Sequence, residues 1–396
     1  MGSNTKSIHK KTKVLVFVGH YLPGFKSGGI LRSVENAINY LCDEFDFFVL
    51  TRNHDVGDTT PYSNVRLNQW KTVGNSKVLY LDPNSSSFNN ICTTVNLTPH
   101  DLIHLNSFFD PLSIKVLLGN KIGKIKCGPI VLSPRGEFGW ASLRIRFYKK
   151  LVYMLISKLF GFFNGIIWHA STMNEKKDIM KIMRVKEDDI HVAKDLPLPV
   201  SQNYVSKPPY EESDSAHALR VVFISNVGPE KNLHYAINIL SKVKVQLVFD
   251  IYGRIVDEKY WNKCQRLINT LPEHVLASYL GELKPNEVVN TFSKYDLFLL
   301  PSGGENYGHV IAESLSSGTP VLISKNTPWL DLESQNLGWD IDLKDMDSFV
   351  KIIERMARID RDEHQYKRNN IRKKIKEILI NSSDVEDNKF LYQQSY

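Results

Sequence analysis

The chain has 396 residues, of which 42% are hydrophobic and 23% are charged, a composition typical of a globular protein with a packed core. The length exceeds that of one typical core and predicts two domains. No apolar run approaches the roughly 20 residues of a membrane span, which excludes an integral membrane protein. The net charge of +7 favours polyanionic partners, such as nucleotide diphosphates, acidic lipids or nucleic acid, without choosing among them.

The cysteines indicate the compartment. They are scattered, at Cys42, Cys92, Cys127 and Cys264, with no Cys-x-x-Cys motif and no histidine cluster at metal-ligand spacing. We therefore expect reduced, mostly buried thiols in a cytosolic protein without a signal peptide. Met1-Gly2-Ser3 is typical of an expression tag, and we expect residues 1–12 to form a tail.

The first half of the chain alternates short β-rich runs with helical patterns. Strands are predicted at 14–18, 45–51, 78–81, 102–105, 130–132, 165–169 and 190–193. Helices are predicted between several of them, for example at 31–41, 142–160 and 174–183. This alternation predicts a parallel, doubly wound sheet, and we interpret residues 13–200 as one Rossmann-like domain.

A glycine pair follows the first predicted strand. The strand ends at Gly19-His20, and a loop leads through Gly28-Gly29 to a helix that carries Arg32. Such a pair allows the backbone to approach a ligand closely, although any tight turn can use one. The full G-x-G-x-x-G pattern is missing, which counts against a nicotinamide enzyme. Arg32 either reaches the ligand or lies in solvent.

Polar residues follow the strand at 130–132. Arg135, if it faces a ligand, could hold a β-phosphate or a charged acceptor, and Glu137 could bind acceptor hydroxyls. A structural pair between these two residues is an equally good interpretation. His104 and His169 end two other strands, where a lone histidine is usually a satisfied structural residue.

Residues 142–163 mix large apolar residues with Arg144, Arg146, Lys149, Lys150 and Lys158. Our first interpretation is a helix that packs on the sheet and carries a basic outer stripe. Our second is a surface that contacts an anionic membrane.

The second half of the chain repeats the alternation. Prolines and polar residues predict a linker at 201–218. Strands are then predicted at 221–225, 246–253, 278–280, 296–301 and 321–323, and a long polar helix near 362–380. We interpret 219–380 as a second Rossmann-like domain that faces the first across a cleft, and 381–396 as a tail that packs back on the N-terminal domain.

A lysine lies where the first strand of this second domain ends. In the segment FISNVGPEKNL (223–233), Gly228-Pro229 turns the chain, and Glu230-Lys231 is predicted to open a helix. A cation at that place is repelled by the positive end of the helix dipole, so a bound negative ligand would offset the repulsion. A solvated helix residue is the alternative for Lys231.

The segment GGENYGHVIAESLSSGTPVLIS (303–324) is the most informative part of the chain. It reads as a loop, a helix and a strand, with Glu305 in the loop and Glu313 about two turns into the helix. The backbone amides of Asn306, Tyr307, Gly308 and His309 would open this helix and attract a diphosphate. Glu305 can accept hydrogen bonds from sugar hydroxyls, and Glu313 from a ribose diol. Two solvated charges are the weaker interpretation.

The stretch PSGGENYGHVIAESLSSGTPVLISKNTPW (301–329) resembles the Glu-x7-Glu signature of family 4 glycosyltransferases, and the likeness extends from about Lys13 to Trp339. These are retaining enzymes of the GT-B fold, and the most similar ones build bacterial O-antigens, capsules and exopolysaccharides. The resemblance implies that Glu305 binds the donor sugar, that Glu313 binds the ribose, and that backbone groups near Leu283 read the base. The glycines at 28 and 29 match the loop over the diphosphate.

The chain departs from the family at one position. The resemblance implies that Lys231 grips the donor diphosphate beside an arginine, but Asn226 occupies the arginine's place. A charged hydrogen bond contributes roughly 1.5–3 kcal/mol against about 1 for a neutral one. Either another cation substitutes, with Arg254 as the candidate, or donor binding is weak. An exposed loop residue is an equally good interpretation of Arg254.

We therefore expect a metal-independent retaining hexosyltransferase without a cofactor, cytoplasmic or peripheral on the inner face of the membrane. It would move a sugar from a UDP- or GDP-sugar to a hydroxyl of a lipid-linked glycan and would bind no nucleic acid. The leaving diphosphate would be stabilised by Lys231 and helix amides, with Arg254 or Arg135. The alternatives are a sugar-nucleotide epimerase of similar fold and a non-catalytic nucleotide-sugar-binding subunit.

Overall fold

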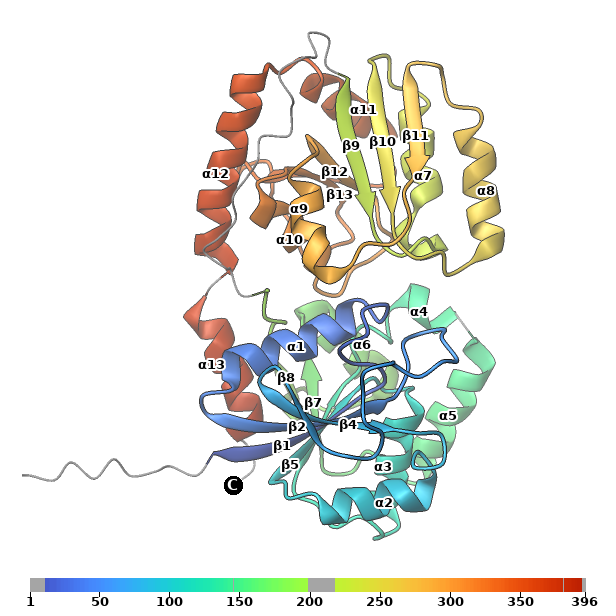
Figure 1. The fold of residues 1–396 in the computed structure, drawn as a ribbon, viewed down its shortest axis with the longest axis vertical. Coiled ribbons are helices and arrows are strands. Elements are labelled where there is room, and N and C mark those ends of the chain that lie inside the picture. The colour runs from blue at the N-terminus through green and yellow to red at the C-terminus, as the bar shows by residue number, and fades with distance from the viewer. Residues whose placement is uncertain (1–10, 145, 199–217, 380, 394–396) are drawn as a thin grey trace, which may run out of the picture. The chain divides into compact units, whose positions relative to one another are not determined.

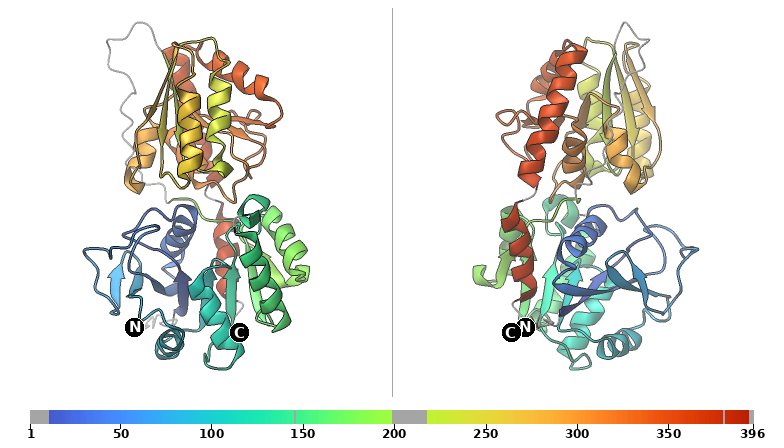
Figure 2. Two further views of the ribbon diagram at one scale, coloured as in Figure 1. Left: turned by 90° about the vertical axis from the view of Figure 1, so that its right-hand side faces the viewer. Right: turned by 60° about the vertical axis from the view of Figure 1, so that its left-hand side comes forward.

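The computed structural model describes residues 11–144, 146–198, 218–379 and 381–393, and it divides the chain into two compact units (Figures 1 and 2). We call Met1–Leu196 together with Ser382–Tyr396 the N-terminal unit, and Pro197–Asn381 the C-terminal unit. The predicted tail up to residue 10, and the predicted linker apart from Ala218, lie outside the described residues.

The N-terminal unit is built on a sheet with the strand order β3-β4-β2-β1-β5-β6-β7-β8. The strands are β1 (Thr12–Val18), β2 (Phe45–Arg52), β3 (Lys71–Val73), β4 (Ser76–Leu81), β5 (Leu102–Asn106), β6 (Ile130–Ser133), β7 (Ile166–Ala170) and β8 (Ile190–Val192). Neighbouring strands are parallel except β3, which pairs antiparallel with β4. The order reverses at β1, so the loops after β1 and β5 lie at a switch point, where open α/β sheets bind ligands.

Helices pack on both faces of this sheet (Figure 1). They are α1 (Gly29–Leu41), α2 (Phe88–Leu97), α3 (Pro111–Lys121), α4 (Trp140–Arg144), α5 (Phe147–Leu159), α6 (Met173–Met183) and α13 (Ser382–Gln393), with a short 3-10 turn η1 (Glu187–Asp189). Successive residues of a strand point to opposite faces. Leu15 and Phe17 therefore pack with α2, α3 and α6, whereas Val14 and Val16 pack with α1 and α13.

The C-terminal helix α13 completes the core of the N-terminal unit. The ring of Tyr392 lies 5.5 Å from the ring of Phe45 and 6.0 Å from that of Phe47, measured between centroids. The side-chain amide of Asn388 donates to the carbonyl of Lys194 at 2.8 Å. Helix α13 is thus held in the N-terminal unit by aromatic packing and by hydrogen bonding to the segment after β8.

The C-terminal unit contains a fully parallel sheet with the order β11-β10-β9-β12-β13-β14. Its strands are β9 (Leu219–Ile224), β10 (Leu247–Tyr252), β11 (Val275–Tyr279), β12 (Leu297–Leu300), β13 (Val321–Ser324) and β14 (Gly338–Ile341). Its helices are η2 (Pro229–Lys231), α7 (Leu233–Leu240), α8 (Glu258–Ile268), α9 (Pro285–Phe292), α10 (His309–Ser317), α11 (Met346–Met356) and α12 (Arg361–Leu379). In sequence order this is the 3-2-1-4-5-6 arrangement of Rossmann folds, with its switch point between β9 and β12.

Two helix predictions were wrong in detail. The single helix predicted at 142–160 is two helices, because Arg146 adopts a left-handed conformation with φ 54° between α4 and α5. Glu230 and Lys231 lie in the 3-10 turn η2, and left-handed Asn232 separates this turn from α7. Lys231 therefore precedes the α-helix instead of opening it.

Within the described residues, no helix is both long and apolar enough to cross a membrane.

Candidate functional site

Two loops meet at the switch point of the C-terminal sheet. The backbone N–H of Gly303, after β12, donates to the carbonyl of Glu230, after β9, at 2.7 Å. The side-chain amide of Asn232 donates to the carbonyl of Pro301 at 3.0 Å. These contacts fix the two loops against each other, so the side chains that they carry have defined positions.

Lys231 and Glu305 are the charged residues that this arrangement brings together. Lys231 Nζ donates to Glu305 Oε1 at 2.7 Å, and both side chains are largely buried. The backbone N–H of Glu305 also donates to the carbonyl of Asn326 at 3.3 Å, which ties the backbone at Glu305 to a third loop. An ammonium group has three donors. A bound anion could therefore share Lys231 with Glu305, which remains able to accept hydrogen bonds from hydroxyl groups.

The loop after β12 leads into α10, as the sequence predicts. Gly308 precedes this helix with φ 82°, a left-handed conformation that favours glycine, and its acidic residue Glu313 is buried. Glu313 lies about one turn into the helix, closer to its start than the predicted two turns. The positive end of the helix dipole thus lies in the same loop as Glu305.

An aromatic brace holds this loop and was missed by the sequence analysis. The indole N–H of Trp329 donates to the carbonyl of Tyr307 at 2.7 Å. The ring of Tyr307 lies 4.7 Å from the ring of His309. Ser324 adds a hydrogen bond of 2.5 Å to the carbonyl of Ser302. Trp329 lies in the stretch that carries the family resemblance, so its position was visible in the sequence but its bracing contact was not.

The remaining donor-side residues follow the three adjacent strands β9, β10 and β11. Asn226 is half-buried after β9, and Arg254 is half-buried after β10. The backbone N–H of Val227 donates to the carbonyl of Arg254 at 2.8 Å, so the two loops are in contact. Leu283 follows β11 and packs at the edge of the core. That Arg254 takes the role of the arginine replaced by Asn226 stays a prediction. The contact between the loops after β9 and β10 places the two residues in neighbouring loops.

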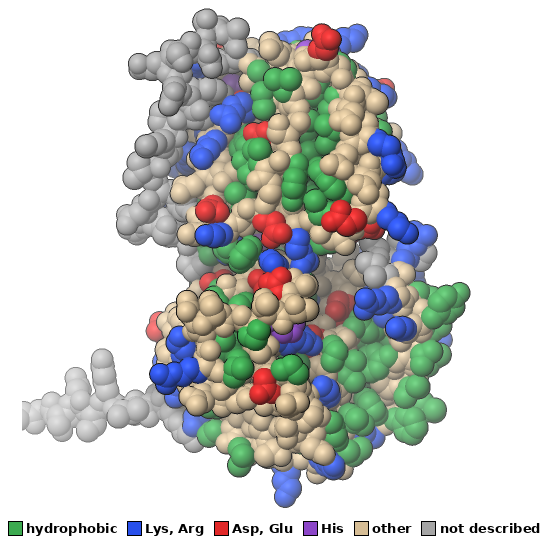
Figure 3. All heavy atoms as spheres, turned by 45° about the vertical axis from the view of Figure 1, so that its right-hand side comes forward, with side chains coloured by type: hydrophobic (Ala, Val, Ile, Leu, Met, Phe, Trp, Pro, Cys, Tyr) green, Lys and Arg blue, Asp and Glu red, His purple; other side chains and the backbone are tan. Residues whose placement is uncertain are grey.

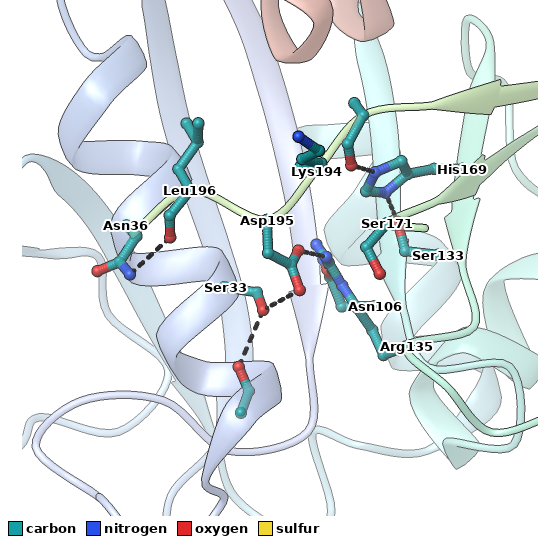
Figure 4. Close-up of polar contacts among 12 residues, drawn as sticks. Ser33, Asn36, Asn106, Ser133, Arg135, His169, Ser171, Lys194, Asp195 and Leu196 are labelled. Carbon is teal, nitrogen blue, oxygen red and sulfur yellow. Dashed lines mark hydrogen bonds and ion pairs between the residues drawn. The ribbon is translucent and has the colours of Figure 1, made fainter. Parts of the chain in front are cut away.

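In the N-terminal unit, Gly28 caps α1 with φ 64° and ψ −129°, a conformation that favours glycine, and Gly29 is the first residue of the helix. The helix start is tied to the segment after β8 (Figure 4). Ser33 Oγ donates to Asp195 Oδ2 at 2.8 Å, and the side-chain amide of Asn36 donates to the carbonyl of Leu196 at 2.9 Å. Arg32 lies 3.9 Å from Glu35, whose pKa is raised by burial.

Arg135 is engaged by other groups of the protein. Its guanidinium forms an ion pair with Asp195, and both side chains are buried (Figure 4). Its Nε and Nη2 donate to Asn106 Oδ1 at 3.0 and 2.7 Å. This network joins the ends of β5 and β6 to α1 through Asp195 and Ser33. A contact of Arg135 with a phosphate or an acceptor stays a prediction.

Glu137 does not pair with Arg135, contrary to the structural alternative considered from the sequence. Its carboxylate accepts from the hydroxyl of Ser107 at 2.7 Å and from the backbone N–H groups of Phe108 and Phe109 at 2.6 and 3.2 Å. Burial raises the pKa of Glu137, and these donors oppose the shift. Glu137 therefore orders the loop between β5 and α3, and its predicted contact with acceptor hydroxyls stays a prediction.

The two strand-end histidines form a buried hydrogen-bonded chain, in agreement with the structural role expected for them. His169 Nε2 lies 2.8 Å from the carbonyl of Ala193, which can only accept, so His169 Nδ1 accepts from Ser133 at 2.6 Å. Ser133 then accepts from His104 Nε2 at 2.7 Å, and His104 Nδ1 accepts from the hydroxyl of Tyr392 at 2.9 Å. Burial lowers the pKa of both histidines, that of His169 to about 4.

The loop before α1 is ordered by residues that the sequence analysis missed. Asp55 accepts from the backbone N–H groups of Phe25 and Lys26 at 2.7 and 3.1 Å. Arg52 forms two hydrogen bonds, of 2.8 and 3.0 Å, with the carboxylate of Asp110 beside Gly19. These acids and bases lie in loops or at the ends of elements, without a distinctive motif, so their spacing in the sequence gave no signal. Among the described residues, no three His, Cys, Asp or Glu side chains gather closely enough to hold a metal ion.

The chain is similar to known proteins in sequence and in fold. Residues 214–374, most of the C-terminal unit, match the family model described as Glycosyl transferases group 1. The sulfoquinovosyl transferase SQD2 of Arabidopsis thaliana is 27% identical over 106 residues, which cover 26% of this chain but only 19% of that protein. An uncharacterized 41.2 kDa protein in the cps region of Klebsiella pneumoniae is 23% identical over 273 residues, which cover 68% of this chain and 73% of that protein.

Solved structures show the fold of the whole chain. HepE from Anabaena, in complex with UDP-glucose, is similar with a TM-score of 0.65 and 17% identity, over 96% of this chain and 98% of HepE. WaaG, a glycosyltransferase involved in lipopolysaccharide biosynthesis, is similar with a TM-score of 0.63 and 13% identity, over 96% and 99%. The chain has the GT-B fold of two parallel-sheet α/β domains. The family match is confined to residues 214–374, and the solved structures extend the similarity of fold to almost the whole chain.

Proposed function

We propose that the protein is a retaining hexosyltransferase of family 4 that moves a sugar from a nucleoside-diphosphate donor to a hydroxyl of a glycan. The observation that carries this proposal is the contact of Lys231 with Glu305 at the switch point of the C-terminal sheet, beside the start of α10. A cation, a helix N-terminus and two carboxylates at this place suit a diphosphate joined to two polyhydroxylated groups.

The donor would bind to the C-terminal unit with its diphosphate at Lys231 and at the first amides of α10. Glu305 would accept hydrogen bonds from the transferred sugar, and Glu313 from the ribose. When the bond between the sugar and the diphosphate breaks, negative charge grows on the leaving oxygen. The prepositioned ammonium of Lys231 and the helix dipole would stabilise that charge, and no metal ion is required in this scheme.

We further propose that the acceptor is a lipid-linked glycan of bacterial surface polysaccharide synthesis, used at the inner face of the cytoplasmic membrane. The similarity to the fold of WaaG and to a protein in the Klebsiella cps region supports this assignment. The N-terminal unit would supply the acceptor-side groups, with the loop before α1 as the element that approaches the reacting sugar.

Product analysis tests the proposal. The full chain is incubated with labelled UDP- and GDP-sugars and with lipid-linked glycans extracted from bacterial membranes, and the products are separated by chromatography and identified by mass. We expect label in the glycan, with the anomeric configuration of the donor. Release of an epimerised nucleotide sugar without an acceptor would identify an epimerase. Donor binding without turnover of any acceptor would identify a binding subunit.

A further inference from the structure

Helix α5 of the N-terminal unit turns a row of large apolar side chains away from the core. Tyr148, Val152, Leu155 and Leu159 recur at intervals of three and four residues, so they share one face of the helix, and all four are exposed. Tyr148 is 80% exposed and Leu159 is 82% exposed. The buried residues of α5 are only Met154 and Ser157, which lie on the opposite face. The core therefore does not account for these four apolar residues of the helix.

The apolar face continues beyond these four residues. Phe147, Ile156 and Phe160 are also exposed, and Figure 3 shows hydrophobic side chains gathered on one side of the N-terminal unit, with lysine and arginine side chains at their edge. We call these seven residues, 147, 148, 152, 155, 156, 159 and 160, the α5 patch. A contiguous apolar patch rimmed by polar groups marks an interaction site.

Along the chain, the charges next to the patch have one sign. From 140 to 165 the sequence contains five lysines and arginines and no aspartate or glutamate. Lys150 is turned inward, with Nζ 2.7 Å from the carbonyl of Ser142 and over the ring of Phe109. Lys158 is likewise bonded to the carbonyl of Ile182. Arg144, Arg146 and Lys149 are exposed at the N-terminal end of α5. The patch is thus bordered by exposed cations without acidic neighbours along the chain.

We infer that the α5 patch docks the N-terminal unit on an anionic lipid bilayer. A helix with an apolar outer face bordered by cations lies in the plane of a membrane interface, with its apolar side chains among the acyl chains and its cations at the head groups. The amphipathic ring of Tyr148 suits that boundary. A nucleic acid would need cations at the centre of the face, where leucines lie here. The inference gives the proposed enzyme a route to a lipid-linked acceptor.

Vesicle co-sedimentation of the full chain tests the inference. Vesicles of phosphatidylcholine alone are compared with vesicles that also contain phosphatidylglycerol. We expect binding to the anionic vesicles that weakens at high salt, and a loss of roughly tenfold or more in the variant L155S/L159S. Replacing Arg144, Arg146 and Lys149 by glutamine should weaken binding to the anionic vesicles only. The control L97S/I122S removes two exposed apolar residues of the same unit outside the patch, of which Leu97 is 78% exposed, and should bind as wild type does.

Three outcomes would overturn the inference. The wild type would fail to bind anionic vesicles, or the variant L155S/L159S would bind as well as wild type. In the third outcome, the wild type would bind no vesicles and would sediment as a dimer without lipid, whereas L155S/L159S would sediment as a monomer. That result would assign the patch to contact with a second copy of the chain. The experiment measures lipid binding and not sugar transfer. A failure to bind vesicles would therefore leave the proposed glycosyl transfer untouched, and a failure to transfer sugar would leave the inferred membrane binding untouched.

Discussion

Lys231 and Glu305 are 74 positions apart in the sequence, yet the ammonium of one lies 2.7 Å from the carboxylate of the other. They meet because β9 and β12 are neighbours at the switch point, so the loops that follow these strands leave the sheet side by side. The pair holds a cation in place before any ligand arrives. Preorganisation of this kind lowers the cost of stabilising a leaving group.

The ion pair should be required for transfer but not for folding. We expect Lys231→Ala to lower the rate of transfer by 10²-fold or more, on the order of what removing one such stabilising group costs. The variant should still fold, with a lower melting temperature because Glu305 loses its partner in a largely buried pair. Initial rates and thermal melts of the full chain measure both. Lys259→Ala, an exposed lysine of α8 in the same unit, is the matched control and should retain wild-type rates.

Glu305→Ala should abolish transfer and leave the fold intact, since the carboxylate is proposed to bind the transferred sugar. Glu305→Gln keeps a hydrogen-bond acceptor for Lys231 and for sugar hydroxyls, so we expect it to retain more activity than Glu305→Ala. The measurement is the rate of transfer at saturating donor. Wild-type rates in Glu305→Ala would remove this residue from the site.

Asn226 offers the sharpest test of donor binding. If this position has simply lost a charged donor, Asn226→Arg should tighten UDP or GDP binding by about 1 kcal/mol, roughly fivefold. Isothermal titration calorimetry of the full chain measures the change. If Arg254 already fills the role, Asn226→Arg should bring no gain, and Arg254→Ala should weaken binding instead.

Arg135 and Asp195 should matter first for stability. Their buried ion pair links β6 to the start of α1, and breaking such a pair by removing one partner costs about 3–5 kcal/mol. We expect Asp195→Ala to lower the urea midpoint of the N-terminal unit strongly, whereas Lys186→Ala at an exposed site should not. An unchanged midpoint in Asp195→Ala would show that the network does not hold this unit together.

The buried histidines predict that the N-terminal unit loses stability in acid. Burial lowers the pKa of His169 to about 4, against about 6.5 for an exposed histidine. The unfolded chain then takes up the proton at a higher pH than the folded chain does. The contribution of His169 to the free energy of unfolding should therefore be constant above about pH 6.5. Between about pH 6.5 and pH 4 it should fall by on the order of 3 kcal/mol.

Urea midpoints between pH 7 and 4.5 measure this dependence. His104, whose pKa burial also lowers, acts in the same direction. His169→Gln should flatten the dependence in this range, and His364→Gln on α12 of the other unit is the control for losing a histidine. An equally steep dependence in His169→Gln would assign the acid sensitivity to other groups.

The sequence predicted most of the fold because its signals were local. The apolar runs of β1, β9 and β12 are buried, and Gly318 ends α10 in a left-handed conformation. It missed β3 and β14, which are short and carry lysine or aspartate. The break at Arg146 has no glycine or proline to announce it, and so was predicted as continuous helix.

The site was predictable in part for the same reason. Glu305, Glu313 and Gly308 belong to one contiguous motif, whereas the bracing residue Trp329 and the pairing of Arg135 with Asp195 depend on contacts between distant segments. The α5 patch shows a third case. The sequence contained its cations and apolar residues, but only the burial of Met154 and Ser157 showed which face of α5 points outward.

A crystal structure of the full chain with an intact UDP- or GDP-sugar would show whether the loops after β9 and β12 bind the donor. We expect the diphosphate to lie within hydrogen-bond reach of Lys231 Nζ, about 3 Å, and Glu305 and Glu313 to accept from hydroxyls of the sugar and the ribose. A nucleotide sugar bound away from the loops after β9 and β12, with the Lys231–Glu305 contact untouched, would contradict this expectation.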